Sequence, residues 1–108
     1  MELDALRKAN LARQAERDPA SLITPSYRGN ELAGEVGEAC NIIKKLERER
    51  LGIRGSRASV EDLALELADI VICVDLLASS YGIYLDGAVV RKFNMISEKY
   101  NLKTRVER

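Results

Sequence analysis

The chain has 108 residues, which is the size of one domain and too short for two separate hydrophobic cores. Its 17 basic and 17 acidic residues balance, so it lacks the basic excess of proteins that bind nucleic acid or a membrane surface, and neither partner is expected. There is no histidine, the commonest general base and transition-metal ligand, so any metal ion should be a hard cation held by oxygen atoms.

The N-terminal part predicts one helix followed by a loop. An amphipathic pattern over residues 3–17 predicts the helix, which Asp18 and Pro19 should end. Turn and breaker residues dominate positions 18–29, which we expect to form a loop. The first ten residues are charged, unlike a signal peptide, and no apolar run approaches the length of a membrane span. We therefore expect a cytoplasmic protein.

A second helix is predicted over about residues 31–51. Asn30 is a suitable N-cap, and apolar positions recur on one face as far as Leu46. Gly52 and Gly55 should break the helix.

Two more helices follow. Ser59 and Asp62 have the spacing of a capping box, which predicts the start of a third helix that runs from 60 to about 81. This helix is apolar on more than one face, which favours burial against another subunit. Asp86 should cap a fourth helix over about 87–100, and a loose polar tail should follow.

These elements predict an all-α, four-helix bundle-like domain that assembles as an oligomer. The single domain would comprise an N-terminal helix and loop (1–28), three further helices (29–100) and a C-terminal tail (101–108). Two cysteines, Cys40 and Cys73, fall in apolar helical patterns, so both should be reduced core thiols. Phe93 and Tyr100 are expected in the core as well.

Two acidic stripes are the most unusual feature of the sequence. The second and third helices each carry acids at offsets 0, 4 and 7, which places them on one helix face. The stripes consist of Glu31, Glu35 and Glu38, and of Asp62, Glu66 and Asp69. A short linker should pack the two helices antiparallel, so that the stripes can face each other. Converging carboxylates repel, so they would take up protons or hold a cation; oxygen ligands favour Mg²⁺, with Mn²⁺ as a substitute.

The alternative is that both stripes are solvated helix faces. Lys44 and Lys45 lie close enough in sequence to pair with some of the acids. Against this, Gly34 and Gly37 lie inside the predicted second helix, where each glycine lowers helix stability by about 1 kcal/mol relative to alanine. Such glycines favour the close approach of another helix or of a ligand.

Two segments, ELAGEVGEA and LALELADIVICVDLLASSYGI, resemble the MazG-like nucleoside triphosphate pyrophosphohydrolases of the all-α NTP pyrophosphatase superfamily. The family pattern E-x-x-E, spacer, E-x-x-D is matched by Glu35, Glu38, Glu66 and Asp69. The later RKFNMISEKY also fits, and the resemblance covers about residues 27–104.

The resemblance implies a Mg²⁺-dependent enzyme that cleaves a ribo- or deoxyribonucleoside triphosphate between the α and β phosphates. The products would be a monophosphate and pyrophosphate, and the role nucleotide-pool control or house-cleaning. Residues 29–100 would be the catalytic helices. Their four pattern acids, Glu35, Glu38, Glu66 and Asp69, would be the catalytic and metal-binding residues. Family members are usually dimers or tetramers, and a neighbouring subunit can contribute to the site.

Residues for the substrate are assigned in the same way. Lys92 and Asn94 match the family's lysine and asparagine on the last helix, and imply contacts to phosphate and to sugar or base. Lys45 and Arg28 are further candidates for the phosphates, and Tyr27 could stack on the base.

Glu31 and Asp62 are candidates for a position behind the metal ligands, although Asp62 equally suits a helix start. Either Glu38 or Glu35 could position the attacking water. A di-iron carboxylate bundle is disfavoured because such sites use Glu-x-x-His pairs. A non-catalytic nucleotide-binding protein or helical interaction module of the same fold stays open as the alternative function.

Overall fold

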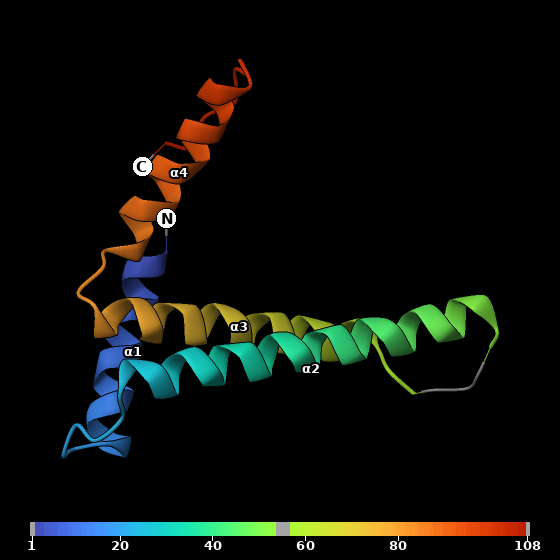
Figure 1. The fold of residues 1–108 in the computed structure, drawn as a ribbon, viewed down its shortest axis with the longest axis horizontal. Helices are drawn as coiled ribbons and strands as arrows, with labels where there is room; N and C mark the ends of the chain where they lie inside the picture. Colours follow the sequence, from blue (N-terminus) through green and yellow to red (C-terminus); the bar gives the residue numbers. More distant parts are fainter. Residues whose placement is uncertain (1, 54–56, 108) are drawn as a thin grey trace.

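The computed structural model describes residues 2–53 and 57–107. Within these ranges the chain is all-α, without a strand, as the sequence predicts. The four helices are α1 (Leu3–Arg17), α2 (Pro25–Leu51), α3 (Val60–Ser80) and α4 (Leu85–Lys99) (Figure 1). None of the described helices is both long and apolar enough to cross a membrane.

A long antiparallel hairpin of α2 and α3 organises the fold (Figure 1). α1 crosses α3 at one end of the hairpin and also contacts α4, which points away from the hairpin. The four helices therefore pack together, but one chain does not close them into a compact bundle.

The start of α2 differs from the prediction. The helix begins at Pro25, in the first-turn position where the missing N–H of proline costs nothing. The true N-cap is Thr24, whose Oγ1 accepts a 3.2 Å hydrogen bond from the backbone N–H of Tyr27. Asn30 lies inside the helix and donates to the carbonyl of Ser26, so the predicted cap at Asn30 is wrong. Tyr27 and Arg28 consequently belong to a helix rather than to a loop.

The end of α2 and the start of α3 follow the prediction. Gly52 ends α2 in the left-handed region, with φ +68°. Ser59 caps α3 as the first half of a capping box: its Oγ accepts from the Asp62 N–H at 3.0 Å, and the Asp62 carboxylate accepts from the Ser59 N–H at 2.9 Å. The break predicted at Gly55 falls outside the described residues.

The start of α4 and the C-terminal tail depart from the prediction. Asp86 is not the cap of α4 but a buried residue of its first turn, because the helix begins at Leu85. The tail is not loose: Asn94 donates to the carbonyl of Val106 at 3.1 Å and accepts from its N–H at 2.8 Å. These two hydrogen bonds hold the tail against α4.

A buried polar cluster fixes α1 to α3. Asp75 is 0% exposed and accepts a 3.0 Å hydrogen bond from the Arg7 Nε and a 2.9 Å bond from the Asn10 Nδ2. Arg7 also donates to the carbonyl of Ile83, so the same side chain ties down the segment that leads into α4.

The apolar core of one chain is small. The buried apolar residues of the described chain are Ala39, Cys73 and Ala78. Cys73 is therefore a core thiol as predicted, but Cys40 is exposed, and so are the expected core residues Phe93 and Tyr100. The predicted burial of these last three residues is wrong for the single chain.

Candidate functional site

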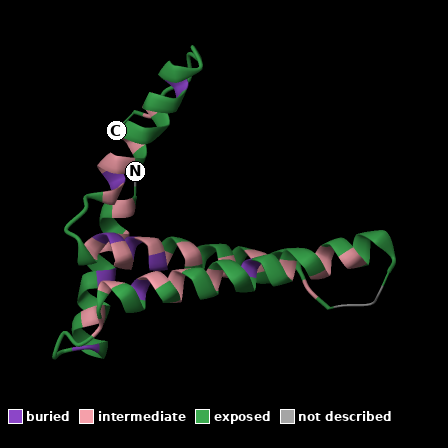
Figure 2. Ribbon diagram, viewed as in Figure 1, coloured by how far each residue is buried: buried purple, intermediate pink, exposed green. Residues whose placement is uncertain are grey.

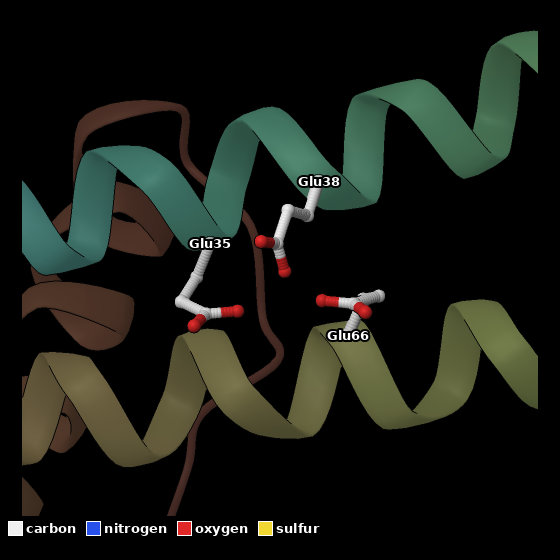
Figure 3. A group of neighbouring side chains, drawn as sticks. All are labelled: Glu35, Glu38 and Glu66. Atoms are coloured by element: carbon white, nitrogen blue, oxygen red, sulfur yellow. The ribbon is translucent and has the colours of Figure 1, made fainter.

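The two acidic stripes face each other across the hairpin. Glu35 and Glu38 on α2 point toward Glu66 on α3 (Figure 3). Each offers one carboxylate oxygen, and the three oxygens all lie within 4.8 Å of one another. Asp69, the fourth pattern acid, is exposed and is not a member of this carboxylate cluster.

The cluster has the electrostatics of crowded like charges. Burial raises the pKa of the Glu35 carboxyl, and the negative charges of Glu38, Asp69 and Glu66 raise it further. Burial also raises the pKa of Glu66, and the neighbouring carboxylate of Glu38 and the charge of Asp69 raise it further. Asp69 therefore acts on the cluster through its charge although it stands outside the group.

Two oxygens of the cluster have unmet hydrogen-bonding capacity. The Oε2 atoms of Glu35 and Glu66 are both buried, and no group in the described part of the chain donates a hydrogen bond to them. A buried polar atom without a partner is costly, and a cation would satisfy both oxygens and offset the repulsion. Carboxylate oxygens are the ligands that Mg²⁺ prefers, so the donor set fits a hard divalent cation.

The two acids predicted to stand behind the metal ligands have different roles. Glu31 lies one turn before Glu35 and forms an ion pair with the buried Arg28, with Nη1 and Oε1 3.1 Å apart. Burial raises the pKa of the nearby Cys73 thiol to about 11, and the charge of Glu31 contributes to that rise. Asp62 instead completes the capping box of α3.

A pocket of about 180 Å³ adjoins the cluster, between α1 and the first turns of α2. It is lined by three arginines, a tyrosine and two amides, among other groups. The lining residues are Asn10, Arg13, Gln14, Arg17, Ile23, Tyr27, Arg28, Glu31 and Leu76. Glu31 lies only one turn from Glu35, so the pocket and the cluster are neighbours along α2. The Oε1 atom of Gln14 is buried and receives no hydrogen bond from the described residues.

The α1 side of this pocket was not predicted; among the lining residues, the sequence patterns pointed only to Tyr27, Arg28 and Glu31. The missed residues, Asn10, Arg13, Gln14 and Arg17, lie at offsets 0, 3, 4 and 7. This spacing places polar side chains on one helix face, by the same rule that reveals the acidic stripes. The signal is therefore present in the sequence.

The remaining substrate candidates lie elsewhere. Lys92 lines an apolar groove on α4, and the Asn94 amide bonds the C-terminal tail. Because α4 points away from the hairpin, neither residue is brought to the carboxylates of its own chain (Figure 1). Lys45 is a half-buried residue of α2, seven positions after Glu38.

Comparison with known proteins reveals a distant homologue, the gene 37 protein of Mycobacterium phage L5. The two are 31% identical over 74 residues, which make up 68% of this chain and 64% of the phage protein. The chain thus spans about 64% of the length of that relative. No protein-family model matches the chain, and no solved structure matches it.

Proposed function

We propose that the protein is a MazG-like, Mg²⁺-dependent nucleoside triphosphate pyrophosphohydrolase. It would convert an NTP or dNTP and water into the monophosphate and pyrophosphate. The observation that carries the proposal is the cluster of Glu35, Glu38 and Glu66, with two buried oxygens that lack a hydrogen bond from the described chain. The resemblance of the two acid-bearing segments to this family supports the same reaction.

The acids have distinct tasks in this mechanism. A Mg²⁺ ion at this site would supply positive charge that offsets part of the charge of the triphosphate, and Lewis acidity that makes a nearby water more acidic. Glu35, Glu38 and Glu66 would hold the ion, and Asp69 adds a fourth negative charge at the edge of the cluster. Either Glu35 or Glu38 would orient the attacking water and accept its proton. Glu31 holds Arg28 in place at the border between cluster and pocket.

The pocket between α1 and α2 would take one end of the substrate. Its volume of about 180 Å³ is below the roughly 300–1,000 Å³ of a pocket that holds a whole drug-sized ligand. It therefore suits a base or a phosphate rather than an entire nucleotide. Arg13, Arg17 and Arg28 supply guanidinium groups that bind phosphate oxygens, and the half-exposed ring of Tyr27 is available for stacking on a base.

The position of Asp69 favours a second candidate function. Since this acid stands outside the three-carboxylate cluster, the site could bind a nucleotide and a cation without hydrolysing the substrate. A non-catalytic nucleotide-binding protein of the same fold would keep the pocket and the cluster. It would differ from the enzyme only in turnover.

The test is product analysis on a panel of ribo-, deoxyribo- and oxidised triphosphates, with and without Mg²⁺. Monophosphate plus pyrophosphate, formed only with the metal, is the expected result. Orthophosphate plus diphosphate would refute the proposed cleavage position. Nucleotide binding without any product would favour the non-catalytic alternative.

A matched pair of variants locates the activity. Glu38→Gln removes one carboxylate of the cluster and should abolish turnover while the circular dichroism spectrum stays unchanged. Glu61→Gln makes the same chemical change at an exposed acid in the first turn of α3 and should keep full activity. Full activity in Glu38→Gln would show that the cluster is not the site.

A further inference from the structure

The side chain of Asn10 is held in one orientation in the wall of the pocket between α1 and α2. It is 2% exposed, and its Nδ2 donates to Asp75 Oδ2 at 2.9 Å and to the carbonyl oxygen of Ile72 at 3.4 Å. A carboxylate and a carbonyl oxygen accept hydrogen bonds, so the amide cannot be reversed without losing both. The remaining polar atom of the side chain, Oδ1, accepts no hydrogen bond from the described part of the chain. It is therefore an acceptor that a ligand in the pocket can use.

Gln14 supplies a second acceptor, one turn later on the same face of α1. Its Oε1 atom is buried and, among the described residues, has no donor. Side chains four residues apart on a helix have Cβ atoms about 5–6 Å apart. The two hydrogens of one amino group, in bonds of about 2.9 Å, reach two oxygens about 5 Å apart. The spacing of Asn10 and Gln14 therefore suits two acceptors for a single amino group.

The rest of the pocket favours a base over a phosphate at this position. Figure 2 shows that buried positions gather where α1 crosses the hairpin, and the buried Arg28 is one of them. Its charge is offset by Glu31, whose Oε1 lies 3.1 Å from Nη1. Ile23 and Leu76 add apolar surface, and Tyr27 adds an aromatic ring. A phosphate brings acceptor oxygens, which two unpaired carbonyl oxygens and a carboxylate repel, whereas a flat base with N–H donors fits.

We propose that this pocket selects a nucleobase with an exocyclic amino group, which donates to Asn10 Oδ1 and Gln14 Oε1. The inference rests on the proposed function, since that makes the occupant a nucleotide. Cytosine and adenine carry an amino group where uracil and hypoxanthine carry a carbonyl oxygen. That oxygen would face two acceptors and leave both without a donor. The pocket therefore prefers cytosine to uracil and adenine to hypoxanthine.

The expected discrimination follows from the burial of the two acceptors. A closed site built to hydrogen-bond a substrate rejects an analogue without the donor by about 10⁴–10⁵-fold. Asn10 is buried, but Gln14 is half-buried, so water can partly replace the missing donor there. We therefore expect a smaller preference, of about tenfold or more. The exposed Arg13 and Arg17 remain available for the phosphates, which all four nucleotides share, and do not affect the ratio.

Equilibrium titration of the native protein tests the proposal without turnover. The probes are α,β-methylene analogues of dCTP and dUTP, and of ATP and ITP, each with Mg²⁺. The dissociation constant should be lower for the amino member of both pairs, by about tenfold or more. Equal affinities, a preference for the carbonyl member, or no binding of any probe would overturn the proposal.

The titration also separates this proposal from the proposed function. Hydrolysis of triphosphates without a preference for amino bases would refute the base assignment alone. A preference for amino bases in binding, without any product from the corresponding triphosphates, would refute the hydrolase alone.

Variants of Gln14 locate the discrimination. Gln14→Leu removes the acceptor at similar size and should reduce the ratio of the dUTP to the dCTP dissociation constant to below about threefold, whereas Gln14→Glu keeps an acceptor oxygen and should keep the preference. Glu16→Leu is the control, because Glu16 is an exposed residue of α1 that does not line the pocket. A native ratio in Gln14→Leu would refute the role of its carbonyl oxygen. If Gln14→Leu does not fold, as judged by circular dichroism, the two base pairs on the native protein still decide the proposal.

Discussion

The buried cluster around Asp75 supports a quantitative prediction about stability and about the pocket. Asp75→Ala removes the acceptor of two hydrogen bonds, from Arg7 at 3.0 Å and from Asn10 at 2.9 Å. Arg7 and Asn10 belong to α1, and Asn10 also lines the arginine-rich pocket. The substitution should therefore loosen α1 on α3 and, under the proposed function, weaken the binding of nucleotide.

The size of the stability loss depends on whether Arg7 and Asn10 can regain a hydrogen-bond partner from water after the substitution. Breaking a buried ion pair costs about 3–5 kcal/mol, because the remaining charge is left without a partner. The Arg7 side chain is 22% exposed and can regain water, whereas Asn10 is only 2% exposed and cannot. We therefore expect the lower end of that range for Asp75→Ala, about 3 kcal/mol. Asn10→Ala leaves the ion pair intact and should cost about 1–2 kcal/mol.

Urea unfolding of the variants, at one protein concentration, measures these free energies. The double variant Asn10→Ala/Asp75→Ala should be less destabilised than the sum of the single changes, since the two residues share a hydrogen bond. Glu61→Gln, a change at an exposed carboxylate on the same helix away from the acidic cluster, is the control and should change stability little. A loss below about 1 kcal/mol for Asp75→Ala would show that the buried cluster does not hold α1 to α3.

Three further predictions concern charge, capping and the tail. The pKa values of Glu35 and Glu66 are raised in the folded chain, so the metal-free protein should lose stability as the pH rises from 4.5 through those raised values, and added Mg²⁺ should restore the stability at neutral pH. Thermal unfolding at several pH values, with EDTA or with Mg²⁺, measures this dependence. A metal-free protein that becomes more stable over that pH range would contradict the prediction. Thr24→Ala removes the N-cap of α2 and should lower the free energy of unfolding, measured in urea, by about 1 kcal/mol. An equal loss for Asn30→Ala would contradict Thr24 as the cap and favour Asn30 instead. Asn94→Ala should speed amide exchange in the C-terminal tail, and unchanged protection there would refute the two hydrogen bonds as its anchor.

Helix boundaries were predictable where a local side chain decides them. Ser59 and Asp62 satisfy each other's backbone, and Gly52 adopts a conformation that other residues avoid, so their patterns predict the structure correctly. The start of α2 was missed because proline was interpreted as a breaker, although it is favoured in the first turn after a cap such as Thr24. The tail was missed because its order depends on Asn94, a contact over twelve residues that no local pattern reveals.

The candidate site, too, is predictable from the sequence only in part. The facing of Glu35 and Glu38 toward Glu66 follows from helical spacing and a short linker, both visible in the sequence. The position of Asp69 outside the cluster depends on the relative rotation of the two packed helices, which spacing does not determine. The α1 side of the pocket depends on how α1 packs on α3, through hydrogen bonds from Arg7 and Asn10 to the buried carboxylate of Asp75, a tertiary interaction that periodicity does not predict.

Two exposed apolar residues of the hairpin, Val36 and Leu67, directly follow the cluster acids Glu35 and Glu66 in the sequence. Because each pair shares backbone, a rotation of either helix moves the acid and the apolar side chain together. A rotation of about 20° moves a group 5 Å from the helix axis by roughly 1.7 Å. That displacement is far larger than Mg²⁺ tolerates, since its oxygen ligands lie within about 0.1 Å of their ideal distance. An ion held by the carboxylates would therefore set the rotation of both helices, and with it the positions of Val36 and Leu67 on the surface of the hairpin.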